Sequence, residues 1–275
     1  MEIGQQPMMQ LLETKIELGK NLLIKLGHDS VSLILSKPDG TLTNHFYKGF
    51  SKKIETHSLV NKLDSVISES NFTKQNITNV KLIVCNRISS IVPENLFEEK
   101  LSLEYLKFNA KLLKNDFAAN DKIEEIGAIN VYIPFVNVNN YLIEKFGAFN
   151  YYHYSTILIK KLIKIANHKK TSFFVNIQLD SIQIILFKNK KLLLYNNFEI
   201  KEKEDIIYFL ILSMEQNKID NNKTKISLHG IIKKDTYLLL EKFINNIEII
   251  DLSKKTAKTI DLNNLTKIDY LLIWE

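Results

Sequence analysis

Residues 27–35 read Gly-His-Asp-Ser-Val-Ser-Leu-Ile-Leu, and residues 178–186 read Gln-Leu-Asp-Ser-Ile-Gln-Ile-Ile-Leu. The two segments align without a gap at an offset of 151 residues, and alternating apolar residues precede and follow each Asp-Ser pair. Alternation with a period of two is typical of half-buried strands. The segments therefore predict two β-hairpins, which turn at Asp29 and at Asp180.

The same order of elements follows each predicted hairpin. A third strand comes after a turn, and then an amphipathic helix, another strand and a second helix. Each half thus reads β-β-β-α-β-α with a closing strand, and we expect the boundary near residue 150, between units 1–150 and 151–275. Chance likeness of two hairpins is the alternative, but the shared order favours internal duplication. The expected strands are 41–47, 80–85, 126–133, 191–198, 225–228 and 247–250, and the later helices 101–113, 137–146, 155–167 and 235–244.

The composition indicates a protein of a reducing compartment. Cys85 is the only cysteine among 275 residues, so the chain cannot close an internal disulfide. The longest apolar run, residues 206–212, is far shorter than the roughly 20 residues of a membrane-spanning helix. Residues 1–20 carry acidic side chains and lack the apolar core of a signal peptide. We therefore expect a cytoplasmic protein without membrane insertion.

The net charge of +6 raises the question of nucleic-acid binding. Arg87 is the only arginine among 37 basic residues, and the lysines are spread in pairs along the chain. Arginine makes the commonest specific base contact, so a solvated lysine surface is the interpretation that the sequence favours. We do not expect nucleic acid as a partner.

Several further segments occur in chain order: Ile-Val-Pro-Glu-Asn-Leu-Phe at residues 91–97, Leu-Tyr-Asn-Asn-Phe at 194–198, Glu-Asp-Ile-Ile-Tyr at 204–208 and Leu-His-Gly at 228–230. With the hairpin at Asp29, they resemble an uncharacterised bacterial domain-of-unknown-function family with an actin-like ATPase fold. The resemblance implies a duplicated, ribonuclease H-like α/β fold of two mixed-sheet subdomains, each β-β-β-α-β-α-β. Type IV pilus assembly proteins of the PilM kind are similar in plan and act as protein-binding adaptors.

The resemblance also implies where a nucleotide would bind, and glycine is scarce there. The superfamily grips phosphates with glycine-rich hairpins, because a Cβ would obstruct the approach of backbone N–H groups to the phosphate oxygens. Here Gly27 precedes Asp29, and no glycine stands between residues 178 and 186. Asp29 and Asp180 could bind a hydrated magnesium ion, or could simply form the turns. Gly230 is the counterpart of the adenosine-binding turn, with an ordinary strand–helix connection as the alternative.

The place where the superfamily carries a catalytic carboxylate holds none here. It reads Val-Cys-Asn-Arg at residues 84–87. Asn86 and Arg87 could position a ligand, although Arg87 could equally pair with a nearby carboxylate. The six histidines lack the spacing of a zinc site, and Cys85 lies in an apolar strand pattern that suggests an inert thiol. We therefore predict no catalytic residue and no metal site.

The missing glycines favour a non-catalytic actin-like protein that binds a protein partner, with no cofactor. The alternative is a divergent ATPase or small-molecule kinase, which would use Asp29, Asp180 and Gly230 around magnesium and ATP. The aromatic residues between positions 146 and 154 predict either core packing between the halves or an exposed partner surface.

Overall fold

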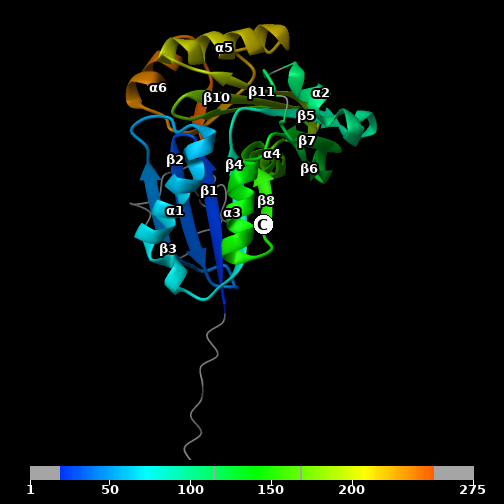
Figure 1. Ribbon diagram of the computed structural model, residues 1–275. Coiled ribbons are helices and arrows are strands. Elements are labelled where there is room, and N and C mark those ends of the chain that lie inside the picture. The colour runs from blue at the N-terminus through cyan, green and yellow to red at the C-terminus, as the bar shows by residue number, and fades with distance from the viewer. Residues whose placement is uncertain (1–18, 109, 114, 168, 251–275) are drawn as a thin grey trace, which may run out of the picture.

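The computed structural model describes residues 19–250 apart from residues 109, 114 and 168. Its strands form two five-stranded mixed sheets and one three-stranded sheet. In Figure 1 the second sheet lies above the first, and the small sheet lies to one side. Each of the two predicted hairpins lies in one of the two larger sheets.

The first sheet has the strand order β3-β2-β1-β4-β8. Neighbouring strands are antiparallel from β3 to β1 and parallel from β1 to β8. Helices α1 and α3 bury their apolar sides against one face of this sheet, where Leu63 and Leu142 are fully buried. The bounds are β1 Lys20–Gly27, β2 Ser30–Ser36, β3 Leu42–Gly49, α1 Leu59–Ser70, β4 Ile77–Cys85, α3 Val136–Phe146 and β8 Asn150–His153.

The second sheet repeats this plan with the order β11-β10-β9-β12-β13 and the same strand directions. Helices α5 and α6 cover its outer face (Figure 1). Helix α5 starts with a capping box, in which Glu202 and Asp205 each accept a main-chain N–H. The bounds are β9 Thr171–Ile177, β10 Ser181–Lys188, β11 Lys191–Glu199, α5 Lys203–Gln216, β12 Ile226–Gly230, α6 Lys234–Leu240 and β13 Ile247–Ile249.

The third sheet, with the order β5-β7-β6, corrects one expectation. Residues 126–133 were expected to close the first sheet, but they contain β7, which pairs only with β5 and β6. The strand that closes the first sheet is β8, only four residues long. A strand of four residues is too short for an alternating pattern to mark it in the sequence. The bounds are β5 Ser89–Pro93, α2 Ser102–Lys107, β6 Ala119–Ile123 and β7 Ala128–Tyr132, with short 3₁₀ turns at Thr56–Ser58, Phe72–Lys74, Glu94–Leu96, Glu99–Leu101 and Glu124–Ile126.

Helix α4, Tyr154–Ile165, joins the two halves. Its buried residues pack against Ile83 of the first sheet and against Phe174 and Phe187 of the second. Burying each such side chain contributes roughly 1.5–3 kcal/mol. The first sheet extends to His153, just past the predicted boundary, which stays a prediction. The aromatic residues between positions 146 and 154 belong to two different cores. Those at 146, 149 and 151 pack against the core of the first sheet, and those at 152 and 154 belong to the core around α4.

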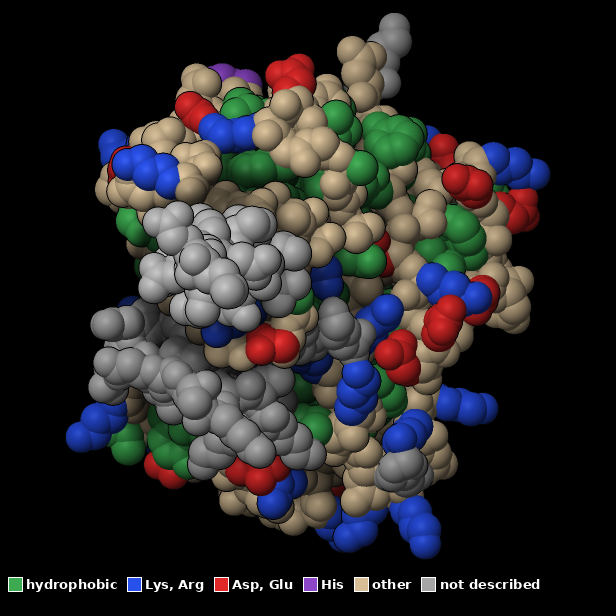
Figure 2. All heavy atoms as spheres, turned by 90° about the horizontal axis from the view of Figure 1, so that it is seen from below, with side chains coloured by type: hydrophobic (Ala, Val, Ile, Leu, Met, Phe, Trp, Pro, Cys, Tyr) green, Lys and Arg blue, Asp and Glu red, His purple; other side chains and the backbone are tan. Residues whose placement is uncertain are grey.

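The molecular surface mixes charges of both signs. On the described part of the face in Figure 2, Lys and Arg side chains stand among Asp, Glu and hydrophobic ones rather than in one basic patch. Among the described helices, none has the length and apolar character needed to cross a membrane.

Candidate functional site

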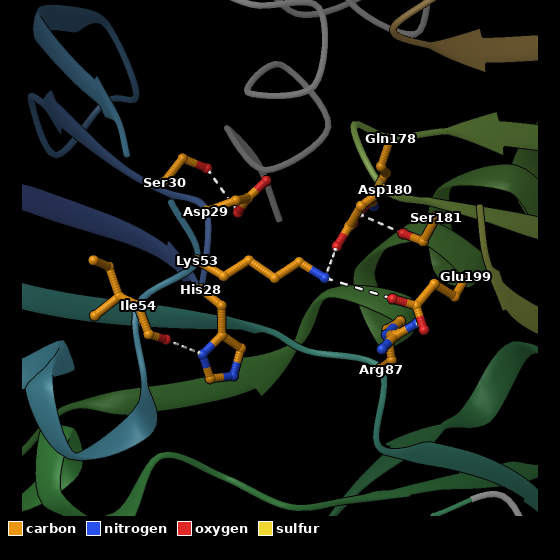
Figure 3. A network of polar contacts seen from close by, with 10 residues as sticks. All are labelled: His28, Asp29, Ser30, Lys53, Ile54, Arg87, Gln178, Asp180, Ser181 and Glu199. Atoms are coloured by element: carbon orange, nitrogen blue, oxygen red, sulfur yellow. Dashed lines mark hydrogen bonds and ion pairs between the residues drawn. The ribbon is translucent and has the colours of Figure 1, made fainter. Parts of the chain in front are cut away.

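The two predicted hairpins face each other across a cleft between the halves. The cleft has a volume of about 230 Å³, and its lining includes Asp29 from the β1–β2 turn and Asp180 from the β9–β10 turn. Figure 3 shows both aspartates at this cleft. Small-molecule sites usually measure roughly 300–1,000 Å³, so this cleft is small for a nucleotide.

A lysine from the first half crosses the cleft. Lys53 lies between β3 and α1, and its Nζ is 2.6 Å from Asp180 Oδ2 and 3.7 Å from Glu199 Oε1 (Figure 3). Arg87 follows β4, and its Nη1 is 2.7 Å from Glu199 Oε2. The Arg87 guanidinium holds the pKa of the Glu199 carboxyl below its usual value. The first half thus supplies two cations, and the second half supplies the two anions that bind them.

The two aspartates have different partners. Asp29 Oδ1 accepts a hydrogen bond of 3.1 Å from the Ser30 hydroxyl, whereas Asp180 is bound to Lys53. In each half the aspartate carbonyl also receives a main-chain N–H, from Phe50 in the first hairpin and Ile200 in the second. The described residues contain no group of three or more His, Cys, Asp or Glu that could hold a metal ion. A magnesium ion at Asp180 would have to displace the Lys53 ammonium.

The glycines near the cleft have packing reasons of their own. A Cβ on Gly27 would lie 2.7 Å from Asp29 Oδ1 and 3.3 Å from the Cys85 carbonyl oxygen. Gly230 has a φ of +93°, and a Cβ there would lie 2.1 Å from the carbonyl oxygen of Ile177. That oxygen accepts the N–H of Ile231 at 2.8 Å. Gly230 ends β12 beside β9 and is not among the residues that line the cleft.

The candidate ligand residues Asn86 and Arg87 both reach the cleft wall, and both are engaged within the chain. Asn86 donates from Nδ2 to the Ile133 carbonyl at 2.8 Å and accepts the Ile88 N–H at 2.9 Å. It therefore fixes the chain where β4 leaves the first sheet for the third. Arg87 pairs with a carboxylate, which was the alternative drawn from the sequence.

A polar network that the sequence did not reveal adjoins the cleft. Gln183 and Tyr154 line it, and Gln183 Nε2 donates to the Ser155 hydroxyl at 3.2 Å and to the Tyr195 hydroxyl at 3.3 Å. Asn176 donates to Gln183 Oε1 at 2.8 Å. Burial raises the pKa of Tyr195, so its hydroxyl stays protonated. These hydrogen bonds tie β9, β10 and β11 to the start of α4.

A buried carboxylate anchors the third sheet to the same helix. Asp121 accepts the Thr156 hydroxyl at 2.7 Å, the main-chain N–H of His153 at 2.8 Å and the Tyr132 hydroxyl at 3.1 Å. Burial raises the pKa of Asp121 in spite of these donors. Burial also lowers the pKa of His153 to about 4, so the imidazole is neutral at pH 7. No spacing rule singles out Asp121, because its partners lie on other elements.

Comparison with known proteins assigns the family. The profile of a family described as a protein of unknown function, DUF3822, matches residues 9–247. The chain belongs to the DUF3822 family. Among curated proteins, none matches this DUF3822 chain in sequence.

Two solved structures resemble the DUF3822 protein over nearly its whole length. A Bacteroides thetaiotaomicron protein with an actin-like ATPase fold and unknown function has a TM-score of 0.76 at 22% identity, covering 94% of this chain and 97% of that chain. The PilM–PilN type IV pilus biogenesis complex has a TM-score of 0.62 at 12% identity, covering 93% and 96%. The DUF3822 protein therefore has the actin-like ATPase fold, as its resemblance to that superfamily implied.

Proposed function

We propose that this DUF3822 protein is a non-catalytic, cytoplasmic actin-like protein that binds another protein and has a degenerate nucleotide site. The observation that carries the proposal is the Lys53 ammonium, which lies between the two hairpins and pairs with Asp180 at 2.6 Å. In the parent superfamily, phosphates and their metal ion would occupy this space. The protein's own cation now neutralises the aspartate that a hydrated metal ion would need.

Two further features support this proposal. The hairpin turns lack the glycines that would let backbone N–H groups approach phosphate, and the cleft is small, at about 230 Å³. The fold shared with PilM, which forms a complex with PilN, is compatible with a role in protein assembly. That support is an analogy of fold.

The second candidate is a divergent ATP-binding protein, an ATPase or a small-molecule kinase. It is favoured by one observation: Asp29 and Asp180 stand on facing hairpins that occupy equivalent places in the two sheets. Binding would require Lys53 to leave Asp180 and to pair with a phosphate instead. Gly230 would then contribute to the adenosine contact.

Thermal unfolding with and without 5 mM magnesium-ATP separates the two candidates. A ligand that binds only the folded state stabilises it in proportion to ln(1 + [L]/Kd). The proposed function predicts no change in Tm for the wild type or for Asp29→Ala. A rise in Tm of several degrees in the wild type that is lost in Asp29→Ala would refute it and support the ATP-binding candidate.

A further inference from the structure

A larger hollow lies beside the cleft, between strand β5 of the third sheet and strand β11 of the second sheet. This groove has a volume of about 1280 Å³. Each of its two strands stands at the edge of its sheet, as the orders β5-β7-β6 and β11-β10-β9-β12-β13 show. Figure 1 shows the two strands close together at one side of the molecule. Edge strands carry unpaired main-chain N–H and C=O groups, which can pair with another chain.

The register of β11 tells which of its main-chain groups face the groove. Ile200 donates its N–H to the carbonyl of Asp180 across the β10–β11 hairpin. Alternate residues of an antiparallel strand direct their main-chain groups to opposite edges. The main-chain N–H and C=O groups of Phe198 and Asn196 therefore point to β10. The main-chain groups of Asn197 and Tyr195 point away from β10, to the groove.

Lys191 and Glu199 place charges at the two ends of β11, and its ladder to β10 shifts register between Leu192 and Leu194, but its central part lacks the devices that usually protect an edge. Its residues 192–198 contain no charged side chain and no proline. The equivalent edge of the first sheet, β3, carries Lys48, whose Nζ is 2.6 Å from Glu69. The facing strand β5 is shorter and contains Pro93, which has no N–H to donate. Of the two strands that border the groove, β11 is thus the one suited to accept another strand.

The groove lining sets the chemistry of an occupant. Apolar side chains at Ile91 and Ile126 lie on the side of the third sheet, and β11 adds Leu194 and Phe198. An added strand would direct alternate side chains towards these surfaces. Among the charged residues of the lining, Arg87 and Glu199 pair with each other.

The charge that remains in the groove is positive. Lys111 and Lys191 line it, and no ion pair to another described residue is seen for either. Both side chains are solvent-exposed. A segment with acidic residues would complement them, whereas a basic segment would be repelled.

We propose that this groove binds an extended segment of another protein, which pairs with β11 as a sixth strand and combines alternating apolar side chains with an acidic residue near Lys191. The proposal rests on the proposed protein-binding function and names its surface and the kind of partner. Strand addition of this sort draws affinity from main-chain hydrogen bonds and specificity from alternate side chains.

Selection from a random nonapeptide display library on the folded full chain, followed by fluorescence anisotropy with the selected peptide, tests the proposal. We expect enrichment of alternating apolar residues with an acidic end. Asn197→Pro removes one groove-facing N–H and leaves the ladder to β10 intact, so it should weaken binding at least 10-fold. Tyr47→Pro is the matched control, because Tyr47 holds the same register position on β3. It should leave the affinity unchanged.

A charge reversal keeps the test independent of the tolerance of β11 for proline. Lys191→Glu should weaken the selected peptide several-fold, and Lys190→Glu, a neighbour outside the groove lining, should not. Failure to enrich any peptide, or an affinity indifferent to both Asn197→Pro and Lys191→Glu, would overturn the proposal. Self-association that Asn197→Pro abolishes, without peptide enrichment, would assign the groove to a second copy and overturn it too. The magnesium-ATP experiment tests the proposed function separately. If the peptide experiments fail, the proposed function can therefore still hold, with the partner bound elsewhere on the surface.

Discussion

The two large sheets have the same strand order, yet the ion pairs across the cleft take their cations from the first half and their anions from the second, and the local structure of the halves also differs. The first half supplies Lys53 and Arg87, and the second supplies Asp180 and Glu199. The first half also inserts the third sheet after β4, whereas β12 in the second half leads directly to α6. The two halves thus contact each other across the cleft through ion pairs, with the cations on one half and the anions on the other.

The two halves also differ where the first strand of each hairpin pairs with the parallel strand beside it, β1 with β4 and β9 with β12. In the first half Gly27 of β1 lies opposite Cys85 of β4, and in the second Gly230 of β12 lies opposite Ile177 of β9. One small residue stands at this contact in each half, on opposite strands. Only Gly230 combines the close contact with a positive φ.

The largest effect is therefore expected for Gly230→Ala. Its Cβ would meet a main-chain oxygen at 2.1 Å in a left-handed conformation, so we expect a loss of about 3 kcal/mol in the free energy of unfolding. Gly27→Ala should cost about 1 kcal/mol or less, because the nearest atom belongs to a movable Asp29 side chain. Urea denaturation of both variants measures the difference. Equal stabilities of the two variants would show that packing does not require glycine at position 230. An adenosine contact would then be the better explanation for Gly230.

An intermediate effect should come from His153, which ends the first sheet. Its folded pKa is about 4 and its ordinary value is 6.5, because burial disfavours the charged ring. The folded state is fully stabilised above pH 6.5, and this stability is lost as the pH falls from 6.5 towards 4. Between pH 7 and pH 4.5 the loss amounts to about 2–3 kcal/mol.

The variant His153→Asn isolates this contribution. Asparagine can still accept the N–H of Ser155 that His153 accepts at the start of α4. The difference in unfolding free energy between wild type and variant should shrink as the solution is acidified. A constant difference over this pH range would show that His153 does not titrate as the buried site requires.

The smallest effect on stability is expected for the bridge across the cleft. The side chains of Lys53 and Asp180 are 53% and 35% exposed, and double-mutant cycles on ion pairs exposed to this degree typically give about 0.2–1 kcal/mol. Lys53→Ala should therefore cost less than about 1 kcal/mol, and the cost should fall at high salt. Lys52→Ala, next along the chain, is the control. A double-mutant cycle with Asp180→Asn measures the coupling, and a coupling of zero at low salt would contradict the bridge.

Much of the fold could be predicted from the sequence because it depends on local patterns. The alternation around Asp29 and Asp180 predicted both hairpins, and their constant spacing led to two equivalent sheets. Turn residues predicted the third strand of each half, β3 and β11. Amphipathic patterns predicted the helices that follow them, α1 and α5. The actin-like fold was implied by the resemblance of the chain to an actin-like family, and the solved structures confirm it.

The remaining features depend on contacts between distant segments. Residues 126–133 look like any buried strand, and only tertiary pairing assigns them to a third sheet. Lys53 is one of many lysines, and nothing in its neighbourhood marks it as the partner of Asp180, 127 positions further along. The assignments of Asp29, Asp180 and Gly230 to a nucleotide, and of Asn86 and Arg87 to a ligand, stay predictions.

The most direct test of the account follows the main-chain amides of the two hairpins by ¹⁵N–¹H NMR while magnesium-ATP is added to the full chain. If the two hairpins bind no nucleotide, the amide signals of residues 28–30 and 178–181 should keep their positions up to 5 mM magnesium-ATP. Saturable shifts in both hairpins would contradict the account, because they would place the nucleotide between Asp29 and Asp180, where this structure has the Lys53 ammonium.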